Sequence, residues 1–410
     1  MFATIMGEKF FCGLDVGSQQ LKASLVKVRR GHFELLGVYA AATLGLKKSS
    51  VRDLGDLTEC IKLTVDGLAQ KTGVKIKDLQ LGIGGELIES RRSHAVIPLL
   101  ESGNKAITRL DIKRVIQQAR LLGIKLDEEV THDFPQIFMV DGLNRTSNPT
   151  GIYGRKLEVD LLLLICHTLQ TSSIIKAVNQ AGYEVANLFF TSYASCEVSL
   201  NEKNKTDGCA LIDIGAGATD VLIFKDGVLR CVENIPLGGE QATSHIANHL
   251  QLSFDLAEDI KKSYGMALSV EGEKDEEILV KNESGYFRIK REMIYQVIEP
   301  EITKLVSAIE QLIKGPLYDE LKAGIIMVGG GSLLPGLIER IERNIKLPVS
   351  IGTMNIANTQ LNNSAIFTAA VGLAQMGLTK TFAYTLSTRN PTNWFKNIPN
   401  RLRELYQEYF

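Results

Sequence analysis

The chain has 410 residues, of which 45% are hydrophobic and 23% charged, and its formal net charge is -1. This length predicts two or more domains of ordinary globular composition, and the near-neutral charge lacks the basic footprint of a nucleic-acid-binding protein. The sequence shows no signal-peptide pattern and no uncharged apolar run long enough to cross a bilayer. We therefore expect a cytoplasmic protein, unless something else holds it to a membrane.

Six cysteines are scattered along the chain, mostly inside apolar runs, and none forms a Cys-x-x-Cys pair. That spacing suggests neither a zinc site nor a redox motif. We expect buried thiols in a reducing compartment.

Two segments far apart in the chain begin alike. Residues 11–38 and 210–235 each contain an apolar strand, an Asp, a turn of small residues, a second strand, a short turn and a third strand. Strands joined by such turns predict β-hairpins. The repetition predicts two homologous domains that face each other.

Helical periodicity separates and follows these hairpins. Helices are predicted at 57–73, 170–182, 253–265 and 291–315, and Pro300 is expected to kink or break the last one. The charged stretch 275–294 reads as a hairpin or loop on the surface. Strands mixed with helices indicate an α/β fold.

The turns after the first strand of each hairpin fit a phosphate group. Backbone N–H groups can approach a phosphate closely where no Cβ intervenes, and a carboxylate beside phosphates needs a cation between them. Mg²⁺ commonly binds through one or two carboxylates, waters and substrate phosphates. Either turn alone is an ordinary hairpin turn, but two in matching contexts favour this hypothesis. The candidate phosphate residues are Asp15, Gly17, Ser18, Lys22, Asp213, Gly215, Gly217 and Thr219, and the candidate magnesium residues, acting through water, are Asp15, Asp213 and Asp220.

A third glycine-rich segment follows the buried strand "IIMV". Gly329, Gly330 and Ser332 lie where a flat ring could rest on the backbone, although a flexible loop is the alternative. One helix face carries three charged residues on neighbouring turns, Glu258, Lys261 and Lys262. They either form a second part of this site or make a surface ion pair.

Together these residues resemble the actin-like ATPase superfamily and, within it, the FtsA family of bacterial cell-division proteins. The resemblance covers nearly the whole chain, and its specific marks are the stretches 134–167, 235–250 and 257–265. It implies a two-lobed actin-like fold of duplicated ribonuclease-H-like domains, and it implies nucleotide roles for the candidate residues above. The implied cofactors are ATP and Mg²⁺.

The same resemblance implies the domain boundaries. Residues 86–167 would form an extra subdomain used in self-association and in contacts with other division proteins. The full division is 1–85 (first part of subdomain 1A), 86–167 (subdomain 1C), 168–205 (return to lobe 1), 206–355 (lobe 2), 356–378 (closing helix of lobe 1), 379–393 (linker) and 394–410 (membrane-targeting helix).

Some residues depart from the family pattern. The second phosphate turn carries Ala216 and Ala218, and Thr191 and Ser192 stand where many relatives carry a Glu near the attacking water. A general base must reach its water, and Thr is a poor base. We therefore expect ATP binding with weak or negligible hydrolysis, and no catalytic base is identified. The stretch 82–92 also lacks the Ser-His pair expected there.

The C-terminal residues after Pro399 have one apolar helix face. A helix of this length is too short to cross a bilayer but can lie in the interface, with Trp394 and Phe395 at headgroup depth. The alternative is a helix docked on the protein's own core. One such helix binds weakly, so stable attachment needs several copies side by side. The predicted membrane residues are Trp394, Phe395, Leu402, Leu405, Tyr406, Tyr409 and Phe410.

The resemblance implies a peripheral protein on the inner face of the plasma membrane at the division site. It would polymerise and anchor FtsZ filaments there, through the FtsZ C-terminal peptide, for septum assembly. Two alternatives stay open. One is a PilM-like scaffold of a type IV pilus or secretion machine that binds a membrane protein's peptide. The other is a sugar kinase or chaperone of the same superfamily, for which the sequence offers no convincing substrate-cleft Asp and no second substrate domain.

Overall fold

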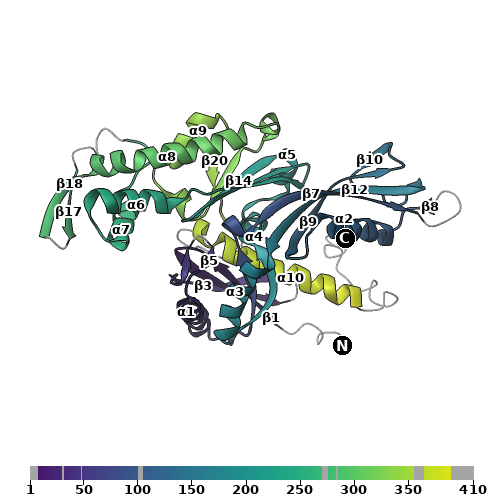
Figure 1. Cartoon of the computed structure of the whole chain (residues 1–410), viewed down its shortest axis with the longest axis horizontal. Helices are drawn as coiled ribbons and strands as arrows, with labels where there is room; N and C mark the ends of the chain where they lie inside the picture. The colour runs from purple at the N-terminus through teal and green to yellow at the C-terminus, as the bar shows by residue number, and fades with distance from the viewer. Residues whose placement is uncertain are drawn as a thin grey trace.

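The computed structural model describes residues 8–29, 32–47, 49–99, 105–269, 276–282, 285–354 and 364–388. They form two lobes with five-stranded sheets, and a further domain inserted into the first lobe. The molecule is elongated, with the inserted domain at one end and the hairpin β17–β18 at the other (Figure 1). The mixed α/β architecture predicted from the sequence is confirmed.

The first lobe has the strand order β13-β6-β1-β2-β3. Strands β1, β2 and β3 form an antiparallel meander, and β6 and β13 are parallel to β1. Helices α1 and α3 cover one face of the sheet, and α4 and α10 pack on the other. The strands are β1 (Lys9–Val16), β2 (Gln20–Arg29), β3 (His32–Ala42), β6 (Asp78–Ile83) and β13 (Glu184–Phe190), with a small hairpin of β4 (Leu46–Lys47) and β5 (Ser50–Val51). The helices are α1 (Leu54–Thr72), η1 (Gly85–Leu87), α3 (Thr168–Gln180), α4 (Thr191–Ser199), η5 (Ser364–Ile366) and α10 (Thr368–Thr388).

The second lobe repeats this topology with the order β16-β15-β14-β19-β20. Its meander is antiparallel, and β19 and β20 are added in parallel. The predicted duplication is therefore present. The strands are β14 (Cys209–Ile214), β15 (Thr219–Lys225), β16 (Val228–Ile235), β19 (Ile325–Val328) and β20 (Val349–Ile351), and the hairpin is β17 (Glu277–Asn282) with β18 (Gly285–Lys290). The helices are α5 (Glu202–Asp207), α6 (Gly239–Leu250), α7 (Phe254–Tyr264), α8 (Arg291–Ile313), η3 (Tyr318–Glu320), η4 (Gly330–Leu333) and α9 (Leu337–Ile345).

Helix α8 runs through Pro300 as one element, so the expected break does not occur. Pro300 is exposed, whereas Ile298 and Ile302 on either side of it are buried in the core of the second lobe. Proline removes one backbone hydrogen bond. The apolar packing on both sides of Pro300 outweighs that loss.

The inserted domain is a four-stranded antiparallel sheet in the order β10-β9-β12-β7, with α2 on one face. Side chains alternate along β12 because strands have a period of two. Leu161 and Leu163 therefore pack toward α2, while Leu162 and Leu164 pack toward the two lobes. The elements are β7 (Glu89–Pro98), β8 (Lys105–Ala106), α2 (Arg109–Gly123), β9 (Glu128–Val140), β10 (Asn144–Thr146), β11 (Tyr153–Gly154) and β12 (Lys156–His167).

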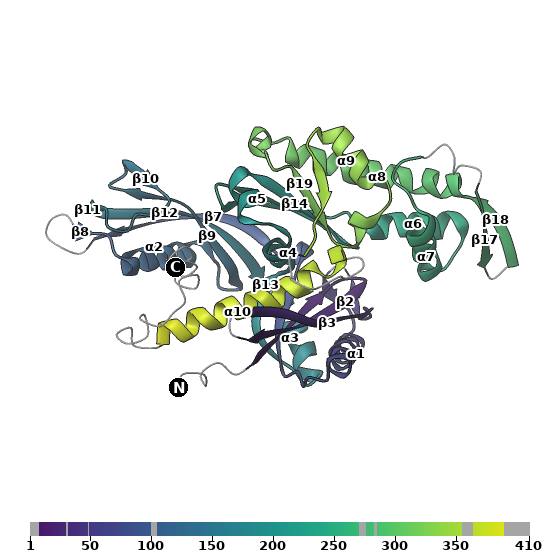
Figure 2. The ribbon, with the colours of Figure 1, turned by 180° about the vertical axis from the view of Figure 1, so that it is seen from behind.

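The C-terminal part differs from the predicted linker. Helix α10 extends to Thr388, so the predicted linker 379–393 begins as helix. The sequence offers no Pro or Gly between Leu378 and Thr388 that would end it. Figure 2 shows α10 crossing the back of the first lobe toward the inserted domain. The predicted membrane residues 394–410 lie outside the described residues.

Two further expectations concern cysteines and membrane spans. All six cysteines are free thiols, and five of them are buried. In the part of the chain that the structure describes, no helix is both long enough and apolar enough to span a bilayer.

Candidate functional site

A cavity of about 590 Å³ lies between the two lobes. Both hairpin turns, the segment after β19, the start of α6 and one face of α7 line it. Its size falls in the usual range for small-molecule and cofactor sites. The repeated hairpins thus bring their turns together from opposite sides of one cleft.

The two hairpins place different charges at the same position. In the first lobe Asp15 lies opposite Lys22, and the Lys22 Nζ is 3.3 Å from the Asp15 Oδ2. In the second lobe the residue opposite Asp213 is Asp220. The first carboxylate therefore has a cation beside it, whereas the second has another carboxylate.

Helix α4 and strand β16 hold these acids in place. Ser192 donates to the Asp220 Oδ2 at 2.6 Å, and Asn234 donates to its Oδ1 at 2.7 Å. The Ser195 Oγ lies 3.4 Å from the Asp213 Oδ2. Asp220 is thus fixed by neutral donors, which satisfy its oxygens without cancelling its charge.

The electrostatic result is clearest at Asp213. Burial raises the pKa of Asp213 to about 7, and repulsion from Asp220 and Asp15 adds to this effect. Burial also raises the pKa of Asp220. Carboxyl groups gathered in this way either keep a proton or share a cation. The oxygen-only donor set is the kind that Mg²⁺ prefers.

Two glycines allow close backbone approach beside these acids. Gly329 has a φ of +83°, and a Cβ there would lie 2.5 Å from the Asp213 Oδ1. At Gly238 a Cβ would lie 2.5 Å from the carbonyl oxygen of Ala216. The turn between β14 and β15 can therefore pack against the first residues of α6, where Glu240 N–H donates to Ala216 O at 2.8 Å.

Helix α7 contributes an ion-paired group to the cavity wall. The Glu258 carboxylate is buried, with Lys261 Nζ at 2.6 Å and Lys262 Nζ at 3.3 Å. Burial alone would raise its pKa, but Lys261 and a hydrogen bond from Thr243 outweigh burial and lower the pKa to about 2. Lys261 also donates to Gly239 O at 2.9 Å, which ties α7 to the start of α6.

Family comparisons match two parts of the chain. The family described as "Cell division protein FtsA" matches residues 210–372, and the domain described as "SHS2 domain inserted in FTSA" matches residues 85–165. The second match coincides with the sheet of β7, β9, β10 and β12 and its helix α2. The chain belongs to the FtsA family.

Whole-chain relatives agree with this assignment. The cell division protein FtsA of Pseudomonas aeruginosa is 29% identical over 384 residues, which cover 92% of this chain and 91% of that protein. FtsA of Escherichia coli K12 is 28% identical and covers 90% of each chain. FtsA of Streptococcus pneumoniae is 29% identical over 85% of this chain and 78% of its own.

Solved structures confirm the actin-like fold of this FtsA-family chain. A "PilM-PilN type IV pilus biogenesis complex" aligns with a TM-score of 0.64 and 16% identity, over 90% of this chain and 98% of that one. MreB5 of Spiroplasma citri bound to ADP aligns with a TM-score of 0.56 and 14% identity, over 93% and 99%. At these identities the likeness concerns the fold alone.

The structure brings most of the residues predicted for this FtsA site into one cavity. The exceptions are Thr219, whose buried hydroxyl donates to Leu237 O, and Ser332, whose buried hydroxyl donates to Gly329 O. Neither of them lines the cavity. The predicted residues that do are Asp15, Gly17, Ser18, Lys22, Asp213, Gly215, Gly217, Asp220, Glu258, Lys261, Lys262, Gly329 and Gly330.

Sequence reasoning missed several parts of the site. Gly238 and Gly239 at the start of α6 line the cavity, and a Gly-Gly pair before a helical run was the available signal. Ser192 was noted only as a departure from the family, yet it holds Asp220. Asn234 carried no local signal, because its role depends on the pairing of β15 with β16.

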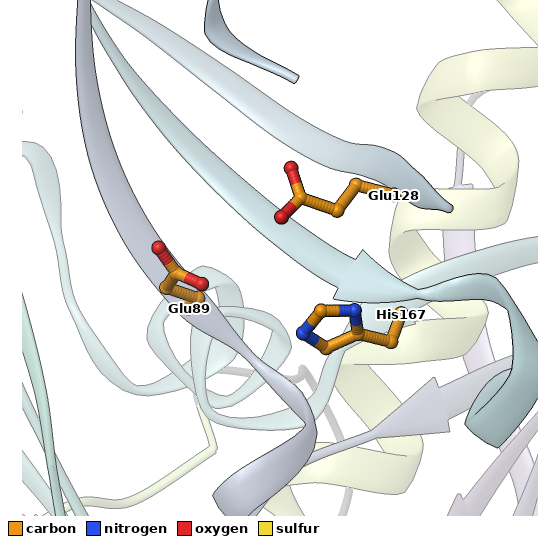
Figure 3. Close-up of side chains that lie close together, drawn as sticks. All are labelled: Glu89, Glu128 and His167. Carbon is orange, nitrogen blue, oxygen red and sulfur yellow. The ribbon is translucent and has the colours of Figure 1, made fainter. Parts of the chain in front are cut away.

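A second cluster, outside the cleft, also resembles a metal site. Glu89, Glu128 and His167 in the inserted domain place one ligand atom each within 4.8 Å of one another (Figure 3). Arg91 already binds both Glu128 oxygens, at 2.6 and 2.9 Å, and also binds Glu89 at 2.7 Å. The hydrogen bonds from Arg91 are the main reason that the pKa of Glu128 falls to about 2. A metal ion would have to displace this guanidinium, so we interpret the cluster as an ion-pair network.

Proposed function

We propose that this FtsA-family protein binds Mg·ATP in the cleft between its lobes. The observation that carries the proposal is the convergence of Asp15, Asp213 and Asp220 beside two phosphate-sized turns of small residues. Mg²⁺, held through water by these acids, would neutralise their charge and that of the phosphates. Lys22 would complete the positive side of the site.

The remaining lining residues suit a nucleoside. Gly329 and Gly330 present bare backbone, and Ile302 and Leu305 of α8 supply apolar surface. Glu258 offers carboxylate oxygens held in position by Lys261. A flat purine against the glycines, with its sugar near α7, would fit this distribution of polar and apolar groups.

We propose that bound ATP is hydrolysed slowly or not at all. Thr191 and Ser192 occupy the cavity wall where the resemblance implies a Glu in many relatives. The Thr191 hydroxyl lies 3.3 Å from Ile83 O, and the Ser192 hydroxyl donates to Asp220. Neither hydroxyl is a base able to take a proton from water. ATP would then act as an assembly switch.

Family membership supports the cellular part of the proposal. The protein would polymerise on the inner face of the plasma membrane at the division site, held there by residues 394–410. It would bind the FtsZ C-terminal peptide and anchor FtsZ filaments for septum assembly. The inserted domain, residues 86–167, would contact neighbouring copies and other division proteins.

The PilM-like alternative receives less support. The PilM–PilN structure shares only the fold at 16% identity, whereas relatives named FtsA align over most of the chain at 28–29%. The inserted domain also matches a domain described from FtsA. We therefore favour the FtsA role over that of a pilus or secretion scaffold.

Co-pelleting tests the cellular role. The full chain is mixed with Mg·ATP, FtsZ polymers and vesicles of bacterial lipid composition, and a chain truncated after Thr388 is the control. We expect FtsZ to pellet with vesicles only when the full chain is present. If the full and the truncated chain are recovered with the vesicles in equal amounts, the tail is not the membrane anchor. No recruitment of FtsZ by a vesicle-bound full chain would contradict the FtsZ role.

A further inference from the structure

Strand β9 of the inserted domain contacts both lobes. On the first lobe the Nε2 of His132 accepts a hydrogen bond from the backbone N–H of Phe190 at 3.0 Å. On the second lobe the Gln136 amide donates to Leu229 O at 2.9 Å, and Arg230 donates back to Gln136 O at 3.0 Å. His132 and Gln136, with three residues of β9 between them, thus contact opposite sides of the cleft.

Both contacts lead directly to the carboxylates of the cleft. Phe190 immediately precedes α4, whose Ser192 and Ser195 hold Asp220 and Asp213. Leu229 lies on β16, which is paired with β15, the strand of Asp220. Strand β9 is therefore connected to the site through the start of α4 on the first lobe. On the second lobe it is connected through the pairing of β16 with β15.

A shared apolar core reinforces these hydrogen bonds. Leu162 and Leu164 of the inserted domain, Phe190 and Cys196 of the first lobe, and Leu222 of the second belong to one buried cluster. Close-packed side chains cannot shift independently of their neighbours. A movement of one lobe against the other must therefore change the packing of the inserted domain.

We propose that β9 couples nucleotide occupancy of the cleft to the position of the inserted domain, with His132 and Gln136 as positioning residues. This inference rests on the proposed binding of Mg·ATP. A nucleotide that contacts both lobes fixes the separation of Phe190 from Leu229, and β9 spans that separation. Binding linkage is reciprocal. If nucleotide changes the affinity for a partner of the inserted domain by some factor, that partner changes the affinity for nucleotide by the same factor.

The chemistry of His132 allows a selective variant. A backbone N–H can only donate, so the Nε2 of His132 carries the lone pair. The ring also packs against Tyr193 and Phe134, with centroid separations of 4.9 and 6.1 Å. His132→Phe keeps an aromatic ring in this stack and leaves the buried N–H of Phe190 without its acceptor. Glu129→Gln, an exposed position on the same strand, is the matched control.

The experiment combines hydrogen exchange with a binding titration of the full chain and Mg·ATP. In the wild type we expect nucleotide to increase protection of residues 128–140 and of the start of α4. We expect His132→Phe to weaken Mg·ATP binding by about fivefold or more and to abolish the change in β9. Gln136→Ala acts on the other lobe and serves as a second variant, with the same expected direction. Glu129→Gln should match the wild type.

Several results would overturn this inference. If Mg·ATP binds the wild type but leaves exchange in β9 unchanged, the proposed coupling is absent. If both His132→Phe and Gln136→Ala unfold more easily but bind Mg·ATP like the wild type, the two residues are only structural. If the wild type binds no Mg·ATP, the proposed nucleotide function itself fails, and the inference fails with it.

Discussion

The two hairpins of the cleft share one fold but differ in one charge. Opposite the first aspartate stands Lys22, and opposite the second stands Asp220. The lysine neutralises Asp15 from within the chain, whereas Asp213 and Asp220 have no such partner across their strand pair. The comparison teaches that the uncompensated negative charge of the cleft lies in the second lobe. Under the proposed function, an external cation would be needed there, and Lys22 of the first lobe would contact the phosphate.

Removal of the central acid should have the largest effect. Asp213→Asn keeps the size of the side chain and removes the charge that would hold a water of Mg²⁺. We expect Mg·ATP affinity to fall by about 10–100-fold, the usual effect of losing an outer-shell metal partner. Titration calorimetry measures it, and Asp226→Asn in the exposed turn after β15 is the control. If the Mg·ATP affinity of Asp213→Asn equals that of the wild type, Asp213 does not help to hold Mg²⁺ in the second lobe.

Removal of the lysine tests the other half of the comparison. Lys22→Met deletes a charge-assisted contact, for which about 1.5 kcal/mol, or roughly tenfold in affinity, is expected. The loss should appear for ATP both with Mg²⁺ and with a chelator, because Lys22 acts on the phosphate directly. Lys27→Met, farther along β2, should bind like the wild type. A loss confined to the Mg²⁺ condition would mean that Lys22 acts through the metal.

The pH dependence follows from the paired acids of the second lobe. With a pKa of about 7, Asp213 loses its proton between pH 6 and pH 8, and only the ionised form attracts a cation. Mg·ATP affinity should therefore rise with pH across this window, by about tenfold at most for one proton. Asp213→Asn should flatten the profile. A wild-type profile that falls with pH would contradict this account.

The same acid should lower the stability of the ligand-free protein. Because the folded pKa of Asp213 is raised, the folded state holds a proton that the unfolded chain releases between about pH 4 and pH 7. Stability then decreases as pH rises through this window. Above pH 7 we expect Asp213→Asn to raise the unfolding free energy by roughly 1–3 kcal/mol, measured by denaturant unfolding without nucleotide. If Asp213→Asn and the wild type have equal unfolding free energies at pH 8, ionised Asp213 does not destabilise the folded protein.

The features that the sequence predicted well are local ones. A strand, an acid and a turn of small residues stand together in the sequence at Asp15 and again at Asp213, so the duplicated hairpins and their joint site followed from pattern alone. Long-range packing was not predictable in this way. The bond from Ser192 to Asp220, the continuous helix through Pro300 and the turn of Thr219 away from the cavity all depend on which surfaces meet in the folded protein.

Proton release on binding tests the central claim most directly. Preformed Mg·ATP is titrated calorimetrically into the full chain at pH 7, in two buffers of different ionisation enthalpy. If the second lobe needs a cation, binding should release about half a proton from Asp213, and Asp213→Asn should not show this release. Tight binding with identical apparent enthalpies in both buffers would contradict it.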